Sequence, residues 1–343
     1  MSESTSTARL SPRMVGAIAA VLTILIWSAF IVVARASADP ARQPTLGAFD
    51  IVFARLLGAG LVLLPLGWWI TRNLRQEARA QGASTLPGSF GGLSPLPLRV
   101  TAELGIFGGL LYGMLAYSGF AFAPAAHASV LMPGSLPLWT ALLALVLLGE
   151  RFTVTRLIGL VCIVGGDLLV GGASLLHAFD GSGVWRGDVL FMVASITWST
   201  YTVLVRKHKV QAVHATTAIT VFAALIFLPV YVLLMLLGAV EPRLLSAPWH
   251  DVVFQMLMQG VGSVVISGIT FNLMIRHYGP VRSTMLTAVV PGLSALLAAL
   301  LLGEPLPWNL LAGLSLVTLG IVFGVYRMAA PQAGAVAVTA GKA

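Results

Sequence analysis

The chain has 343 residues, of which 58% are hydrophobic and only 9% are charged. A soluble domain carries about 25% charged residues, so this composition excludes a water-facing globule. The formal charge of +8 contains no dense basic run, which argues against nucleic-acid binding, and the single cysteine excludes a disulfide framework.

Ten apolar stretches follow one another along the chain, each close to the ~20 residues that cross a bilayer. They lack the alternating pattern of barrel strands, and backbone groups in lipid must be satisfied within the segment, so helices are expected. The first stretch exceeds a signal-peptide core and lacks a convincing cleavage site, so we expect it to be retained. The predicted spans are 14–36, 47–70, 101–123, 125–148, 154–176, 184–205, 213–238, 250–275, 281–302 and 307–327.

The positive charges predict which side of the membrane each loop faces, because short cytoplasmic loops retain Lys and Arg. With the N-terminus inside, fifteen of the 20 Lys and Arg residues are cytoplasmic and four lie on the other side, while Arg55 alone falls within a span. The segments 1–13 and 328–343 are therefore both expected in the cytoplasm. The cytoplasmic loop 71–99 is rich in Pro, Gly and Ser and is the only connection long enough to be partly disordered.

An internal repeat divides the chain into a first unit, 14–176, and a second unit, 184–327. Each unit holds five spans, an odd number, so the second copy enters the membrane from the opposite side. Inverted repeats are typical of alternating-access transporters, which hold a solute near the midplane between the halves. The sequence thus predicts a solvent-reachable hollow there. A shift of 154 residues pairs Pro137 with Pro291, Glu150 with Glu304, Gly159 with Gly313 and Gly166 with Gly320, and a shift of 171 pairs Trp27-Ser28 with Trp198-Ser199 and Arg35 with Arg206.

Aromatic and hydroxyl side chains recur at equivalent depth in spans 1 and 6: Trp27, Ser28, Trp198, Ser199 and, two residues on, Tyr201. Stacking faces and hydroxyls suit a small amphipathic solute, so these residues are predicted to line the central cavity. The alternative is that the aromatic rings fill helix packing or anchor at the headgroups.

Arg55 is the only cation predicted inside a span, where a charge costs about 2.5–3.5 kcal/mol. It either receives a substrate carboxylate or is neutralised by Asp50 or another buried acid and holds the bundle together. Asp167 in span 5 is a candidate for proton coupling, or else a satisfied polar contact among small residues. Its repeat-equivalent position is Ile321, so nothing pairs with it symmetrically.

Three further polar side chains in spans 3 and 8, Tyr117, Gln259 and Asn272, either orient the solute or bond across helices. Pro137 and Pro291 are candidate gate hinges, with fixed bends as the alternative. His127 is expected at the membrane interface without a second ligand at metal spacing, so we predict no metal. No Walker A sequence is present, and ATP or another cofactor is not expected.

The duplicated motifs resemble the two EamA repeats of the drug/metabolite transporter superfamily. The likeness covers nearly the whole chain, although Asp167 departs from the apolar residue expected there and the loop 71–99 is atypically long. It rests on Phe53-Ala54-Arg55, on the tryptophans of spans 1 and 6, on the linkers Pro124-Ala125-Ala126-His127-Ala128-Ser129 and Gly279-Pro280-Val281-Arg282-Ser283, and on the two Leu-Leu-Gly-Glu endings.

The resemblance implies a ten-helix membrane protein with an inverted five-plus-five repeat that exports or exchanges small metabolites such as amino acids across a bacterial cytoplasmic membrane. Nucleotide-sugar antiport and multidrug efflux are alternatives within the superfamily. A non-transporting receptor or scaffold is an alternative of another class. An intramembrane enzyme is not expected, because no H-E-x-x-H or G-x-S-x-G sequence is present. Partners would be the solute and the bilayer, and a homodimer is left open.

Overall fold

The computed structural model describes residues 12–83, 85–150, 153–172, 176, 181, 183–287 and 289–326, and these residues form helices and the loops that join them. In this part of the chain nine helices are long and apolar enough to cross a membrane, and a shorter apolar helix, Trp308–Phe323, follows them. The elements of the spans are α1 (Pro12–Ala38), α2 (Ala48–Ala80), α3 (Leu98–Leu104), η3 (Gly105–Leu111), α4 (Tyr112–Phe120), α5 (Ala125–Ser129), η4 (Val130–Gly134), α6 (Leu136–Leu148), α7 (Val154–Asp167), η5 (Leu168–Gly172), α9 (Val184–Lys207), α10 (Ala212–Leu236), α11 (Trp249–Gln255), η6 (Met256–Ile266), α12 (Ser267–Tyr278), α13 (Pro280–Leu286), α14 (Val289–Leu302) and α15 (Trp308–Tyr326).

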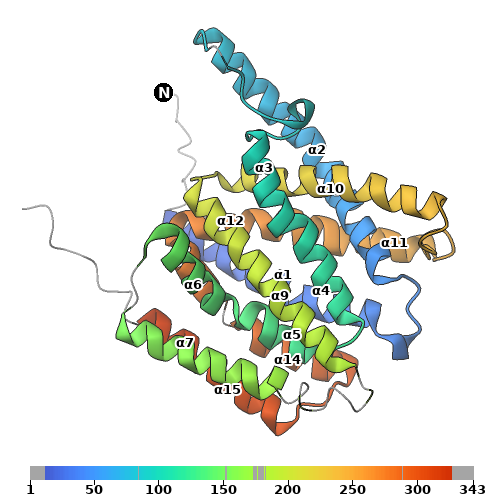
Figure 1. Ribbon diagram of the computed structural model, residues 1–343, viewed down its shortest axis with the longest axis vertical. Helices are drawn as coiled ribbons and strands as arrows, with labels where there is room; N and C mark the ends of the chain where they lie inside the picture. The colour runs from blue at the N-terminus through green and yellow to red at the C-terminus, as the bar shows by residue number, and fades with distance from the viewer. Residues whose placement is uncertain are drawn as a thin grey trace, which may run out of the picture.

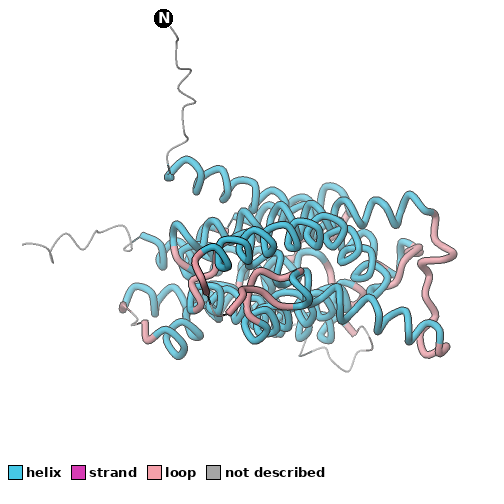
Figure 2. Tube along the Cα trace, turned by 90° about the horizontal axis from the view of Figure 1, so that it is seen from above, coloured by secondary structure: helices cyan, strands magenta, loops and turns pink. Residues whose placement is uncertain are grey.

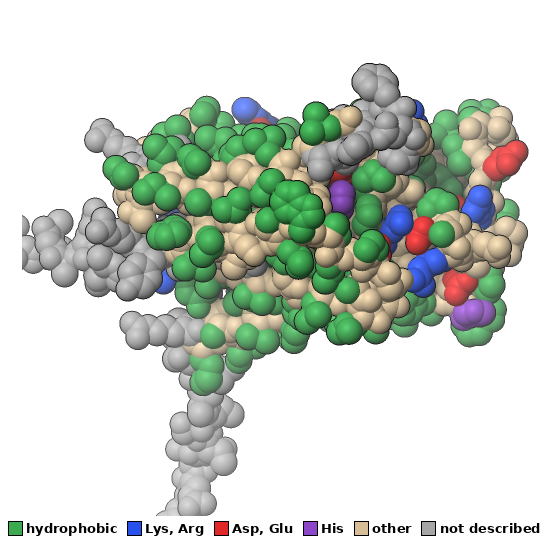
Figure 3. All heavy atoms as spheres, turned by 90° about the horizontal axis from the view of Figure 1, so that it is seen from below, with side chains coloured by type: hydrophobic (Ala, Val, Ile, Leu, Met, Phe, Trp, Pro, Cys, Tyr) green, Lys and Arg blue, Asp and Glu red, His purple; other side chains and the backbone are tan. Residues whose placement is uncertain are grey.

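The helices lie side by side in one bundle (Figures 1 and 2). The start of α1 and the end of α15 lie at the same end of the bundle, which we call the terminal end (Figure 1). The other is called the far end. The face drawn in Figure 3 is covered mainly by hydrophobic and uncharged atoms, with charged side chains gathered toward the far end. Such a surface suits contact with lipid along the length of the helices.

The prediction that residues 71–99 form a loop is wrong for the first ten of them, because α2 continues to Ala80. The segment after residue 70 is polar, but its Leu, Arg, Gln, Glu and Ala residues are good helix formers, so the helix outlasts its apolar stretch. The described turns that follow pack against α2 and α3: Arg75 Nε of α2 donates to Pro87 O at 2.9 Å, and Ser89 Oγ lies 3.1 Å from Thr101 Oγ1 of α3.

The crossing of α7 and α15 identifies the inverted repeat in space. A Cβ on Gly166 would lie 2.5 Å from Gly313 O, and one on Gly313 would lie 2.8 Å from Gly166 O, while Gly320 approaches Gly159 O as closely. Gly159 of the first repeat therefore meets Gly320, which is the counterpart of Gly166. Gly166 in turn meets Gly313, which is the counterpart of Gly159. A two-fold relation between antiparallel copies requires this reciprocal order. The protein is an all-α integral membrane protein built from two inverted five-helix repeats.

Spans 4 and 9 are each interrupted within about two residues of the same repeat position. In span 4 the π-type turn η4 ends at Gly134 and α6 starts at Leu136; in span 9, α13 ends at Leu286 and α14 starts at Val289. Pro137 and Pro291 lie in the first turn of the second segment, where a missing N–H costs little. The break thus precedes both prolines, and their role as hinges stays a prediction.

Candidate functional site

Arg55 of α2 lies at the centre of the bundle and is 6% exposed. Its Nη1 donates to Tyr117 Oη at 3.2 Å and to Ser263 Oγ at 3.1 Å. The guanidinium lies 5.8 Å from the centre of the Phe30 ring and 5.6 Å from that of Tyr117. Two hydroxyls and two aromatic faces therefore solvate this cation without neutralising it.

Asp50, the acid that the sequence offered as the counter-ion of Arg55, is engaged elsewhere. It accepts from Tyr231 Oη at 2.6 Å, and its other oxygen accepts from Gly47 N at 2.8 Å and Arg243 N at 3.2 Å. Among the described residues no carboxylate forms an ion pair with Arg55. The interpretation of Arg55 as one half of a structural ion pair is therefore wrong within the described part of the chain.

The tryptophans of the two repeats meet at the centre. The Trp27 and Trp198 rings lie 5.9 Å apart in an edge-to-face arrangement, and each also contacts Phe271. Trp198 further contacts Tyr112 and Tyr201, at 4.7 and 5.0 Å between ring centres. Because the repeat counterparts 27 and 198 touch one another, they mark the axis that relates the two halves.

The aromatic cluster fills the space predicted to be a hollow. Trp27 and Trp198 border a cavity of about 20 Å³, and Trp198 and Arg55 border a second one of about 10 Å³. These volumes hold a water molecule at most. Within the part of the chain that the structure describes, the prediction of a solvent-reachable hollow is therefore wrong for this conformation, because the rings expected to line it pack into it.

The remaining polar candidates border neither cavity but form two groups in contact with the lining residues Arg55 and Trp198. Tyr117 Oη donates to Gln259 Oε1 at 2.8 Å, which joins Gln259 to Arg55 through the phenol. Asn272 Nδ2 donates to Tyr201 Oη at 2.6 Å. Among the predicted cavity residues, three buried atoms keep no hydrogen-bond partner: Trp198 Nε1, Gln259 Nε2 and Asn272 Oδ1. Each such atom costs about 1–3 kcal/mol, which a bound solute or water can recover.

Ser28 and Ser199 border neither central cavity. Ser28 Oγ donates to Ile24 O of its own helix at 2.8 Å, and Ser199 Oγ donates to Leu136 O at 3.4 Å. These two hydroxyls satisfy backbone carbonyls, so they are left out of the proposed solute site.

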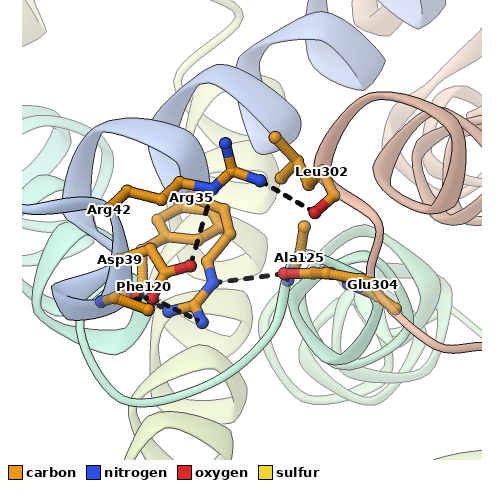
Figure 4. A network of polar contacts seen from close by, with 9 residues as sticks. Arg35, Asp39, Arg42, Phe120, Ala125, Leu302 and Glu304 are labelled. Atoms are coloured by element: carbon orange, nitrogen blue, oxygen red, sulfur yellow. Dashed lines mark hydrogen bonds and ion pairs between the residues drawn. The ribbon is translucent and has the colours of Figure 1, made fainter.

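At the far end of the bundle, an ion pair between Arg35 and Glu304 joins the two repeats (Figure 4). Arg35 Nε donates to Glu304 Oε1 at 3.2 Å, and its Nη1 donates to Phe120 O at 2.8 Å. The Glu304 carboxylate also accepts from the N–H groups of Ala125 at 3.1 Å and Ala126 at 3.3 Å. This network was not predicted from the sequence, although the paired Leu-Leu-Gly-Glu endings and the match of Arg35 with Arg206 indicate its two partners.

The repeat counterparts at the terminal end are arranged differently. Glu150 contacts Arg156, at 3.5 Å between Oε2 and Nη1, and Arg206 is exposed. Within the described residues no ion pair joins Glu150 to Arg206. Arg206 instead lines a pocket of about 410 Å³ together with Lys209 and Arg276.

Asp167 lies outside the central site. It borders a lateral cavity of about 280 Å³ between spans 4, 5 and 6, and neither carboxylate oxygen has a hydrogen-bond partner. His127, expected at the interface, pairs with Asp188 on the same cavity, at 3.0 Å between Nδ1 and Oδ1. Coupling by Asp167 stays a prediction. The described residues contain no group of three His, Cys, Asp or Glu side chains that could hold a metal ion.

Comparison with known proteins identifies the family. Residues 14–172 and 185–326 match the EamA-like transporter family. An uncharacterized transporter of Bacillus subtilis (strain 168), YoaV, is 24% identical over 227 residues, which is 65% of this chain and 72% of that protein. An uncharacterized transporter of Clostridium kluyveri is 23% identical over 164 residues, 48% of this chain and 51% of its own.

A solved crystal structure shares the fold at 20% identity, with a TM-score of 0.60, covering 91% of this chain and 97% of that one. The two matched segments each contain five spans, as the inverted repeat requires. The chain therefore belongs to the EamA-like transporter family of the drug/metabolite transporter superfamily, and it is a multi-pass membrane transporter and not an enzyme.

Proposed function

We propose that this transporter moves small amphipathic solutes that carry a carboxylate, such as amino acids or related metabolites, by exporting or exchanging them. The single observation that carries this proposal is the buried guanidinium of Arg55, which has hydroxyl and aromatic partners but no described counter-ion. A solute carboxylate would supply the missing charge, and paired burial is far cheaper than burial of one ion.

The aromatic rings around Arg55 favour the rest of such a solute. Trp198 borders both central cavities, and Trp27 and Tyr112 border one of them. Rings of this kind bind an apolar solute body, while the unpaired Gln259 Nε2 and Asn272 Oδ1 offer a donor and an acceptor to an amino or hydroxyl group. The side chains would separate to admit the solute, because the present cavities are water-sized.

The terminal end is the cytoplasmic end in this proposal, as the positive-inside rule favours. Its pocket of about 410 Å³ is lined by Arg206, Lys209 and Arg276. Three cations around one opening raise the local concentration of anionic solutes. The location we propose is a bacterial cytoplasmic membrane, with both chain ends in the cytoplasm.

Alternating access in this proposal uses the two ends in turn. The Arg35–Glu304 pair closes the far end, while Arg206 and Glu150 leave the cytoplasmic end unlatched. Formation of the Arg206–Glu150 pair, with release of Arg35 from Glu304, would expose the centre to the far side. The interrupted spans 4 and 9, next to Pro137 and Pro291, are the elements proposed to bend.

Counterflow in proteoliposomes tests the proposal. Purified protein would be assayed with zwitterionic amino acids, monocarboxylates, neutral sugars and organic amines. We expect exchange of the carboxylates, a loss of at least about tenfold in Arg55→Gln, and a smaller loss in Arg55→Lys, which keeps the charge. Thermal unfolding of both variants checks that they fold.

Two results would contradict the proposal. Arg55→Gln that exchanges carboxylates at the wild-type rate removes Arg55 from the site. Absence of counterflow for every solute class would favour a non-transporting receptor or scaffold. Nucleotide-sugar transport is the less favoured alternative. A phosphate-bearing solute calls for several cations at the centre, and among the described residues Arg55 is the one cation there.

A further inference from the structure

A second cavity lies away from the central site, on the side of the bundle formed by spans 4, 5 and 6. Its volume is about 280 Å³, near the lower limit of small-molecule pockets. The lining is apolar except for two carboxylates. It includes Leu131, Trp139, Val164, Asp167, Asp188 and Met192.

Asp167 is the residue that makes this cavity chemically unusual. Its side chain is 7% exposed, and both carboxylate oxygens are buried without a hydrogen-bond partner. A carboxyl group in such a place is costly until a donor or a cation meets it. The other acid, Asp188, already faces His127, at 3.0 and 3.1 Å from Nδ1 to the two oxygens. Asp167 is therefore the carboxyl group that a cationic ligand can balance.

The cavity breaks the two-fold symmetry of the fold. The positions equivalent to Asp167, Asp188 and His127 in the other repeat are Ile321, Ala17 and Val281. Spans 4 and 5 of the first repeat and span 6 of the second form this cavity together. Its acidic residues therefore have no counterpart on the opposite side of the bundle, which indicates a ligand bound at this one place.

We propose that the lateral cavity binds a monovalent organic cation, an alkylammonium with a compact apolar or aromatic body. The ammonium lies against the Asp167 carboxylate, and the body packs on the apolar lining. Trp139 adds an aromatic ring, which attracts alkylammonium groups. A divalent metal fits poorly, because Mg²⁺ and Ca²⁺ require six or more oxygen ligands. This site does not depend on Arg55 or on the function proposed above.

Binding of benzyltrimethylammonium tests the proposal directly. The radiolabelled cation would be equilibrated by dialysis against the full-length protein in a detergent with an uncharged headgroup. We expect saturable binding, and Asp167→Asn, which keeps the side-chain shape, to weaken it at least about tenfold. Val164→Trp fills the cavity from a half-exposed position and is expected to weaken binding as well.

Arg55→Gln separates this site from the solute site. We expect it to bind benzyltrimethylammonium within about twofold of the wild type while losing carboxylate counterflow. No saturable binding by the wild type between about pH 6 and 9 would overturn the proposal, since an Asp167 that keeps its proton cannot bind the cation. The proposal would also be overturned if Asp167→Asn and Val164→Trp both bound benzyltrimethylammonium as tightly as the wild type does.

Discussion

At the far end of the bundle Arg35 and Glu304 lie 3.2 Å apart, whereas their repeat counterparts at the terminal end, Arg206 and Glu150, form no pair with one another. The Glu304 side chain is 12% exposed and the Glu150 side chain 39%. The same two residue types thus occupy equivalent places in opposite states. An inverted repeat can only alternate if its halves differ in conformation at any moment.

The difference also has a local cause in the backbone. Glu304 accepts from the N–H groups of Ala125 and Ala126. The counterparts of these residues are Gly279 and Pro280, and proline has no N–H. Glu150 would therefore find one such donor fewer. Since a hydrogen bond to a charged group contributes about 1.5–3 kcal/mol, the sequence itself favours the bound position of Glu304 over the equivalent position of Glu150.

The largest expected effect comes from Glu304→Gln. Removal of one partner from a mostly buried pair costs about 2–5 kcal/mol, so the far end should open. A single cysteine at the buried Ala126, in a Cys162→Ala background, would report this opening by its reaction with a membrane-impermeant maleimide. We expect labelling at least about tenfold faster than with Glu304 intact. Equal rates would show that this pair does not close the far end.

The crossing of α7 and α15 offers the next largest effect. Gly166→Ala would drive a methyl group against Gly313 O and should destabilise the protein by about 1–3 kcal/mol. Gly165→Ala is the matched control, because its Cβ would meet no atom closer than 3.8 Å, and it should gain about 0.5–1 kcal/mol of helix propensity. Thermal unfolding in detergent measures both. A lower unfolding temperature for Gly165→Ala than for Gly166→Ala would disprove the close crossing.

Glu150→Gln should act on transport more than on stability. In the present conformation the one ion pair that the described residues give Glu150 is with Arg156, at 3.5 Å between Oε2 and Nη1. Its loss should change the unfolding free energy by less than about 1 kcal/mol. Counterflow should fall several-fold, because the opposite conformation loses its latch. Exchange of the two charges, Glu150→Arg with Arg206→Glu, should restore part of the rate. A rate unchanged by Glu150→Gln contradicts the terminal latch.

Pro137→Ala and Pro291→Ala should give the smallest effects. Both prolines lie in the first turn after the break, where alanine fits without a new clash, so the unfolding free energy should change by less than about 1 kcal/mol in each. The two variants should also resemble one another, because the positions are equivalent. Loss of counterflow in one variant alone would show that spans 4 and 9 bend by different means.

Much of the architecture follows from the sequence without any coordinates. Apolar runs of bilayer length require helices, and an odd number of spans per repeat requires inversion, so the fold class was predictable from composition and from the duplicated glycines, prolines and glutamates. The extension of α2 to Ala80 was missed because the hydropathy pattern marks only the apolar residues, whereas the polar residues that follow them are also good helix formers. Arg55, Tyr117 and Gln259 were each predictable as candidates, since polar groups within spans are costly.

Tertiary structure alone decided which of these candidates meet and what state the protein is in. Asp50 and Arg55 both lie on α2, five residues apart, so the helical period places them on different faces. Which groups Arg55 meets on neighbouring helices depends on how those helices pack, which sequence spacing does not encode. The same holds for Trp27 and Trp198, which fill the centre, and for Asp167, which lies in a separate cavity. Both repeats carry an Arg and a Glu at equivalent positions, so the sequence determines the two candidate pairs. Only packing determines that Arg35 and Glu304 meet, whereas among the described residues Glu150 pairs with Arg156.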